Sequence, residues 1–154
     1  MRVGSGQTPA MSAPISEFRL KRRVQFYETD TAGIVHFSVF FRYMEEAEHA
    51  MWRKAGLSIA PPSARIGFPR VATSFEFLRP LRFEDEFEVV LRIARKSVKS
   101  LSYTAEIKAA GDTVARGALT IACVTKVPGE PMRGTPIPAE IAERFTEAPG
   151  AGSL

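Results

Sequence analysis

An acidic side chain, a glycine and the start of an apolar helix follow one another within residues 27–38. Asp30 stands three residues before Gly33, and an amphipathic segment begins soon after. A carboxylate can attack a carbonyl carbon or activate water as a general base, and the free N–H groups at a helix N-terminus can polarise a carbonyl oxygen. This combination predicts chemistry at a polarised carbonyl group, with Asp30 as the reacting carboxylate.

Each polar residue around this loop also has a structural alternative. An aspartate before a turn commonly bonds its own backbone, so Asp30 could simply cap the loop. Glu28 could raise the pKa of Asp30 by like-charge repulsion, although an exposed charge at a strand end is the simpler expectation. Gly33 is expected to allow a backbone conformation or close approach that a side chain would forbid. His36 could orient a substrate or transfer a proton, or could form a packing hydrogen bond near the helix start.

Residues 39–54 have the period of an amphipathic helix that would follow the loop directly. The apolar side chains at i, i+4, i+7 and i+11 are Phe40, Met44, Ala47 and Met51. Ser38 is the expected N-cap, and Gly56 is expected to end the helix. Such a helix would be about 24 Å long, enough to cross a sheet of about five strands.

The remaining segments show the alternation and turn residues of β-strands. Strands are expected at 18–27, 68–79, 86–95, 100–110 and 114–127. Short connections, such as a tight turn at Gly111-Asp112, cannot make parallel crossovers, so the sheet should be antiparallel. The sequence therefore predicts an α+β fold in which an antiparallel sheet of about five strands wraps around one long helix.

The 154 residues are expected to form one domain, at 17–147, between flexible tails at 1–16 and 148–154. The first tail lacks the apolar core of a secretory signal. A short helix is expected from Pro138 to about Phe145. Because one helix cannot protect both edges of the sheet, we expect a homodimer or homotetramer.

Composition excludes several classes of protein. The net charge of +4 suits a phosphorylated ligand as well as nucleic acid, but the aromatic residues do not alternate with basic ones as in single-strand binding surfaces, so we expect no nucleic-acid partner. No apolar run approaches the roughly 18 residues of a membrane span. A single cysteine, Cys123, excludes an internal disulfide and a cysteine-based zinc site, which fits a reducing cytoplasm; we expect this thiol to be buried and inert.

The loop and helix together resemble a known family. Residues 30–35, preceded by Glu28-Thr29 and followed by the helix at 40–47, are similar to the acidic-x-Asp-x-x-Gly-(Ile/Val)-Val signature of the hotdog-fold acyl-CoA thioesterases. The nearest branch resembles the 4-hydroxybenzoyl-CoA thioesterases, which include the Tol–Pal-associated enzymes. The run from Phe75 through Arg79-Pro80 to Asp85 also resembles this family, and the resemblance covers about residues 18–145.

The resemblance implies a hotdog fold and hydrolysis of a CoA or acyl-carrier-protein thioester at a dimer interface. Asp30 would be the catalytic carboxylate, either as a nucleophile through a mixed anhydride or as a general base for water. The backbone N–H of Phe37 would polarise the carbonyl, and His36 is a further catalytic candidate. No metal is implied, and no cofactor beyond the CoA of the substrate. The positions expected to contact substrate are Gly33, Val35, Lys99 and Ser100.

Lys99 is the last residue of a basic run that extends from the end of the strand expected at 86–95 into the turn before the strand expected at 100–110. The run could hold the CoA phosphates or could form a solvated hairpin tip. Its members are Arg92, Arg95, Lys96 and Lys99.

The chain departs from the family just before the helix. Tol–Pal-type members carry Tyr-His where this chain has His36-Phe37, so the histidine is shifted by one place and substrate preference cannot be carried over. Another hotdog branch uses a helix glutamate, which makes Glu46 and Glu48 reserve candidates. The competing functions are a hotdog acyl-CoA hydratase or dehydratase and a non-catalytic acyl-CoA-binding protein; only a thioesterase would release CoA.

Overall fold

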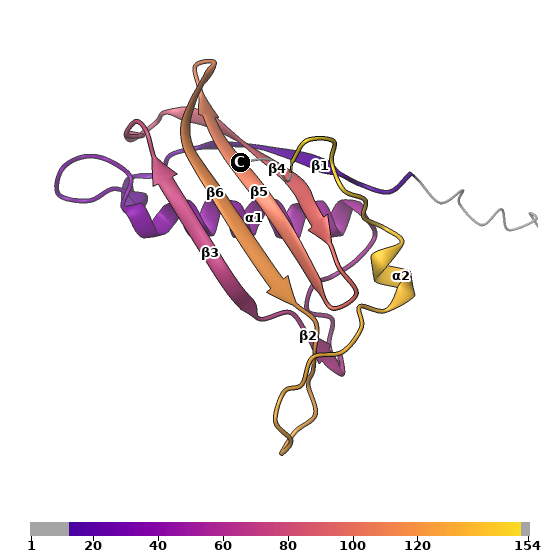
Figure 1. Cartoon of the computed structure of the whole chain (residues 1–154). Helices are drawn as coiled ribbons and strands as arrows, with labels where there is room; N and C mark the ends of the chain where they lie inside the picture. The colour runs from indigo at the N-terminus through magenta and orange to yellow at the C-terminus, as the bar shows by residue number, and fades with distance from the viewer. Residues whose placement is uncertain (1–12, 152–154) are drawn as a thin grey trace, which may run out of the picture.

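A curved antiparallel sheet wraps around one long helix in the computed structural model, which describes residues 13–151 (Figure 1). The sheet has five strands in the order β1-β4-β5-β6-β3, and the helix α1 lies across one of its faces. The bounds are β1 Glu17–Arg23, α1 Phe37–Lys54, β3 Arg70–Phe77, β4 Glu86–Lys96, β5 Ser100–Ala109 and β6 Asp112–Ala122. The predicted α+β arrangement of five strands and one long helix is therefore confirmed.

Four short elements complete the fold. They are the 3-10 helix η1 Phe26–Glu28, the strands β2 Ile66–Gly67 and β7 Val124–Thr125, and the helix α2 Ala139–Ala142. Strands β2 and β7 pair with each other and form the base of an arm, residues 60–67 and 124–134, that projects from the sheet (Figure 1). None of the helices within residues 13–151 has the length and apolar character needed to cross a membrane.

Several element ends differ from the prediction because local backbone bonds interrupt the pattern. The first strand ends at Arg23, and the chain turns into η1 instead of continuing to Tyr27. The strand expected at 114–127 breaks at Cys123, whose N–H donates to the Lys99 carbonyl at 2.7 Å, and its last residues pair with β2. The β5–β6 turn lies one residue earlier than expected, because β5 and β6 pair as far as Ala109 and Asp112.

The core lies between one face of α1 and the inward side chains of the sheet. All four residues of the predicted stripe are buried, together with Tyr43 and Trp52. Strand β5 alternates between buried and half-buried positions from Leu101 to Ile107, as expected for a strand with one face on the core. The indole of Trp52 donates to the hydroxyl of Tyr103 at 2.9 Å and ties the last turn of the helix to this strand.

The two ends of the described chain meet beside β4. Ile15 donates its N–H to Arg144 at 2.9 Å and accepts from Thr146 at 3.0 Å, and the N–H of Ala148 donates to Ile93 at 2.8 Å. Residues near the predicted boundaries at 16 and 147 therefore make backbone hydrogen bonds within the fold. The flexibility of the tails stays a prediction, and residues 1–12 and 152–154 lie outside the described residues.

Candidate active site

The loop that carries Asp30 is closed by its own backbone. The N–H of Asp30 donates to Ile34 at 2.8 Å, and its carbonyl accepts from Gly33 at 3.0 Å. One carboxylate oxygen, Oδ1, accepts from the N–H of Ala32 at 2.8 Å. These bonds fix the orientation of the carboxylate, and its second oxygen has no hydrogen-bond partner among residues 13–151.

Position 33 favours glycine because of its backbone conformation, since there is enough space for a side chain. Its φ of +78° lies in the left-handed region that side chains disfavour. A Cβ atom built on it would meet only a guanidinium nitrogen of Arg82, at an ordinary contact distance of 3.9 Å. Gly33 does not line the cavity described below, so its effect on the site is through the shape of the loop.

Helix α1 begins at Phe37, two residues earlier than predicted, and His36 is its N-cap. Nδ1 of His36 accepts from the N–H of Ser38 at 3.2 Å and lies 2.7 Å from the Ser38 hydroxyl. The prediction of Ser38 as N-cap was wrong because the histidine ring replaces the usual small polar cap. The N–H of Phe37 has no acceptor among residues 13–151, so it is free to bind a ligand.

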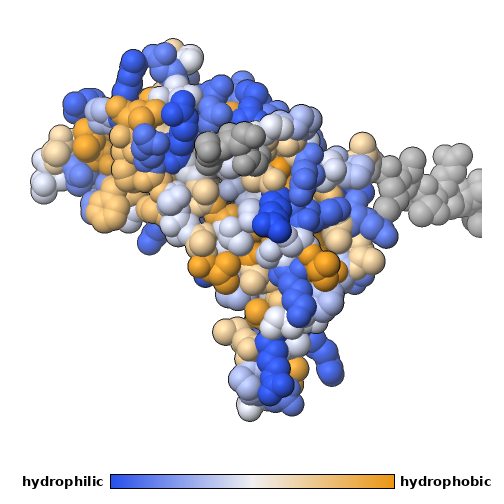
Figure 2. Space-filling view, viewed as in Figure 1, coloured by the Kyte–Doolittle hydropathy of each residue, from blue (hydrophilic) through white to orange (hydrophobic). Residues whose placement is uncertain are grey.

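Asp30 and the first turn of α1 line a cavity of about 380 Å³. Its other wall is the end of β3 and the segment that follows. The lining residues are Asp30, Ile34, Val35, Phe37, Phe40, Phe77, Leu78, Arg79 and Pro80. Apolar residues gather at this end of the molecule in the space-filling view (Figure 2). Two of the lining side chains, those of Phe37 and Phe77, are exposed. The cavity is therefore mainly apolar, with a carboxylate and a helix N-terminus at its edge.

The aromatic wall of the cavity is held by ring contacts between α1 and β3. The ring centroids of Phe40 and Phe77 are 5.1 Å apart, and both rings lie within 6.0 Å of Phe75. Phe75 lies directly over Gly117 of β6, where a Cβ atom would come within 2.7 Å of the ring. The absence of a side chain at Gly117 thus lets Phe75 approach the sheet and support the cavity wall.

Glu28 is buried, with 6% of its surface exposed, so the expectation of an exposed strand-end charge was wrong. Oε2 accepts from Arg22 at 2.8 Å, and Oε1 accepts from the N–H of Gln25 at 2.8 Å and from the hydroxyl of Tyr43 at 3.0 Å. The turn at η1 directs this side chain inward. The spacing between Gln25 and Glu28 is that of a capping box, a sequence signal that could have indicated the bond between them.

His36 is exposed and lies beside the cavity rather than in its wall. Its ring stacks on that of Phe37 with centroids 4.6 Å apart. These contacts match the packing alternative, and a catalytic role for His36 stays a prediction.

Lys99 and Ser100 lie near the C-terminal end of α1, away from Asp30. Ser100 is the first residue of β5, and Tyr103 of this strand accepts a hydrogen bond from Trp52 in the last turn of α1. A helix of 18 residues is about 27 Å long, so one chain does not bring Lys99 close to Asp30. Their contact with substrate stays a prediction. In the same basic run, Arg92 forms ion pairs with two glutamates, and the Lys96 ammonium donates to two backbone carbonyls. The ammonium of Lys99 has neither a carboxylate nor a carbonyl partner within residues 13–151.

The reserve candidates on α1 do not line the cavity either. Glu46 pairs with Arg22 at 3.1 Å. Glu48 is fully buried and pairs with Arg70 of β3 at 2.5 Å; burial raises its pKa, and the guanidinium partly opposes that rise. Cys123 is buried as predicted, and burial raises the pKa of its thiol. Within residues 13–151, no three His, Cys, Asp or Glu side chains are grouped so that they could share a metal ion.

Known proteins match both the sequence and the fold. A protein of Aquifex aeolicus (strain VF5) with a provisional esterase name is 42% identical over 82 residues, which are 52% of this chain and 63% of that protein. A 1,4-dihydroxy-2-naphthoyl-CoA hydrolase of Synechococcus sp. (strain CC9311) is 33% identical over 86 residues, which are 50% of this chain and 57% of that protein. The chain thus spans less than two thirds of the length of these two relatives.

A solved structure extends the match over most of the fold. A 1,4-dihydroxy-2-naphthoyl-CoA thioesterase from Synechocystis superposes with a TM-score of 0.75 at 25% identity, covering 80% of this chain and 91% of that one. This similarity confirms the predicted hotdog fold. The family model described as the thioesterase-like superfamily matches residues 24–145, from the end of β1 to the segment after α2. The chain therefore belongs to the thioesterase-like superfamily.

Proposed function

We propose that this protein hydrolyses an acyl-CoA thioester to a carboxylic acid and CoA, with Asp30 as the reacting carboxylate. The observation that carries this proposal is one cavity lined by Asp30 and by Phe37, whose N–H has no acceptor among residues 13–151. A thioester carbonyl in this cavity would have a carboxylate at its carbon and a hydrogen-bond donor at its oxygen. The family membership supports the same reaction class.

The chemistry follows from these two groups. The N–H of Phe37 and the positive end of the α1 dipole would stabilise the negative charge that develops on the carbonyl oxygen. Asp30 would either attack the carbonyl carbon and displace the thiolate, forming an anhydride that water hydrolyses, or take a proton from the water that attacks. In both routes the C–S bond breaks, the sulfur is protonated and the acid takes an oxygen from water.

An aromatic acyl group is the substrate class that the cavity favours. Phe37, Phe40 and Phe77 supply flat apolar surface next to Asp30, and aromatic rings pack well against one another in edge and offset contacts. Two of the similar proteins are named for the CoA ester of a dihydroxynaphthoic acid, which supports the same class. A panel of aromatic, medium-chain and long-chain thioesters, on CoA and on an acyl carrier protein, would test both parts of the substrate.

We further propose that the active form is a homodimer paired through β3. This strand is at an edge of the sheet, and Val71 and Phe77 are 58% and 46% exposed. Antiparallel pairing of two β3 edges would bring the beginning of one strand beside the end of the other. The Lys99 end of one copy would then lie toward the Asp30 cavity of the other, where it could meet the CoA portion of the substrate.

Replacing Asp30 tests the function most directly. Asp30→Asn should lower kcat for acyl-CoA by about 10²–10⁴-fold and leave the melting temperature nearly unchanged, since the amide oxygen can still accept from Ala32. The measurement is release of free thiol across the thioester panel. Glu130→Gln, an exposed position on the arm, is the control. Wild-type turnover by Asp30→Asn would remove Asp30 from the mechanism, and no thiol release by the wild type would favour the binding-protein alternative.

A further inference from the structure

The carboxylate of Glu28 connects three parts of the chain that meet behind the Asp30 loop. Arg22 reaches it from β1, the N–H of Gln25 from the start of η1, and the hydroxyl of Tyr43 from the second turn of α1. Glu28 and Tyr43 are both buried, and a buried carboxylate is stable only when donors satisfy it. Glu28 therefore fixes the relative positions of β1, η1 and α1 at this point.

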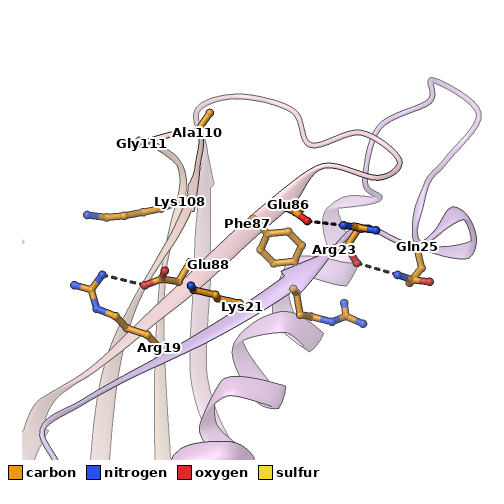
Figure 3. A pocket seen from close by; sticks show the side chains of 11 residues that line it. Arg19, Lys21, Arg23, Gln25, Glu86, Phe87, Glu88, Lys108, Ala110 and Gly111 are labelled. Carbon is orange, nitrogen blue, oxygen red and sulfur yellow. Dashed lines mark hydrogen bonds and ion pairs between the residues drawn. The ribbon is translucent and has the colours of Figure 1, made fainter.

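Arg22 is the only arginine of β1 that faces this site. Burial alternates along β1, so its neighbours Lys21 and Arg23 lie on the exposed face of the sheet, where Arg23 pairs with Glu86 (Figure 3). The guanidinium of Arg22 instead lies over the Tyr43 ring, 4.9 Å from its centroid, and also bonds Glu46. Burial and the nearby Glu28 raise the pKa of Tyr43 further above neutrality, and the hydroxyl keeps the proton that it donates to Glu28.

The backbone of Glu28 holds the other end of the same loop. Its carbonyl accepts from the N–H of His36 at 2.9 Å, directly before the first residue of α1. Thr29 then bridges to Val35, and Asp30 to Ile34, so residues 28–36 form one closed loop with Glu28 at its base. Through its side chain and its carbonyl, Glu28 ties this loop to the helix that carries Phe37.

We propose that Glu28 is a positioning residue that sets the placement of the Asp30 carboxylate relative to the N–H of Phe37. This inference rests on the proposed role of Asp30. Glu28 does not line the cavity, so it acts through the loop and not on the substrate. A displacement of about 1 Å between reacting groups can lower a rate by roughly 10²-fold, so a change at Glu28 should reduce turnover without removing any group that contacts substrate.

Glu28→Gln is the variant that tests the inference. The amide can still accept from Gln25 or Tyr43 but loses the charge that holds Arg22, and the internal bonds of the loop remain. We expect kcat to fall roughly 10–100-fold. We expect KM to change less than about twofold, because no group that contacts substrate is removed. Glu46→Gln removes the other carboxylate from Arg22 without touching the loop, and it should keep wild-type kinetics.

A double-mutant cycle with Asp30→Asn separates positioning from general loss of stability. If Glu28 acts through Asp30, adding Glu28→Gln to Asp30→Asn should cause no further loss of the residual rate. Amide hydrogen exchange of residues 30–35 should also accelerate in Glu28→Gln while the core strands stay protected. If Glu28→Gln proves unfolded, Tyr43→Phe removes a single donor and should show a smaller fall in kcat with the same faster exchange.

The outcomes distinguish this inference from the proposed function. A folded Glu28→Gln with wild-type kcat, or with an equal loss in the presence and absence of Asp30→Asn, would overturn the positioning role. Wild-type turnover by Asp30→Asn alone would overturn the proposed function instead. In that case the exchange measurement still reports whether Glu28 holds the loop.

Discussion

The carboxylate of Asp30 can serve both of the roles that its sequence position suggested. Oδ1 caps the loop by accepting from Ala32, while the other oxygen has no partner within residues 13–151. Loop capping and catalysis are therefore compatible at this residue, because a carboxylate has two oxygens. The capping bond also restricts rotation of the side chain, as the proposed reaction would require, because a carboxylate reacts with a carbonyl carbon in one orientation.

The role of the Phe37 N–H can be tested by replacing the residue with proline. Proline is tolerated at the first position of a helix, and His36 before it already has the extended conformation that proline requires, with φ −62° and ψ 136°. Phe37→Pro should therefore fold but lose the donor to the carbonyl oxygen. We expect kcat for acyl-CoA to fall by about 10²–10³-fold, measured by thiol release.

Phe37→Ala is the matched control, since it removes the ring and keeps the N–H. It should raise KM for an aromatic acyl-CoA more than it lowers kcat, because the ring lines the cavity. Equal kcat values for the proline and alanine variants would show that this N–H does not act on the transition state.

At the scale of elements, an ion pair between the buried Glu48 and the partly exposed Arg70 connects the middle of α1 to the start of β3. Glu48 is fully buried, and its partner Arg70 also bonds Glu45 at 3.2 Å. Burying a carboxylate is costly, and here burial raises its pKa even with Arg70 adjacent. This pair fixes the edge strand against the helix at the end opposite to Asp30.

The pH dependence of stability should reveal this buried carboxyl group. A carboxyl whose pKa is raised by folding favours the folded state at low pH and loses that advantage as it ionises. Compared with Glu48→Gln, the wild type should therefore lose stability as the pH rises from about 4.3, the ordinary glutamate value, to the raised value in the folded state. Urea unfolding of both proteins across this range measures the difference, and a constant difference would contradict the expectation.

Local patterns in the sequence were sufficient to predict the main elements and the loop that carries Asp30. The stripe from Phe40 to Met51 is set by helical periodicity, and the turn at Gly33 is set by a conformation that few residues adopt. Both features depend on neighbours within about a dozen residues. For that reason the order of the elements and the position of Asp30 before a helix were predictable.

Features that depend on distant partners were not predictable in the same way. The burial of Glu28 depends on Tyr43, which lies fifteen residues later on another element. Arg79 joins the cavity wall only because β3 pairs with β6 and brings its end beside α1. The histidine N-cap was missed because His36 takes a place that small polar residues usually occupy.

For the whole molecule, the exposed edge of β3 should control association. Val71→Lys places a charge on this edge at a position that is 58% exposed, so the monomer should still fold. If two copies pair through β3, this variant should have half the mass of the wild type by light scattering. Because the proposed pairing also brings the Lys99 end of one copy toward the cavity of the other, its activity should fall as well.

Val98→Lys is the control, since it adds the same charge at a 71% exposed site in the turn between β4 and β5. It should leave the mass unchanged. A Val71→Lys protein with the mass and activity of the wild type would place the interface elsewhere on the surface.

Gly117 affects the shape of the cavity beside Asp30 from a neighbouring strand. A side chain at 117 would displace the ring of Phe75, which contacts the rings of Phe40 and Phe77 in the cavity wall. Substrate range could thus drift during divergence through one position on a neighbouring strand, while Asp30 and the helix start stay untouched. Chains with the same reacting groups could in this way come to prefer acids of different width.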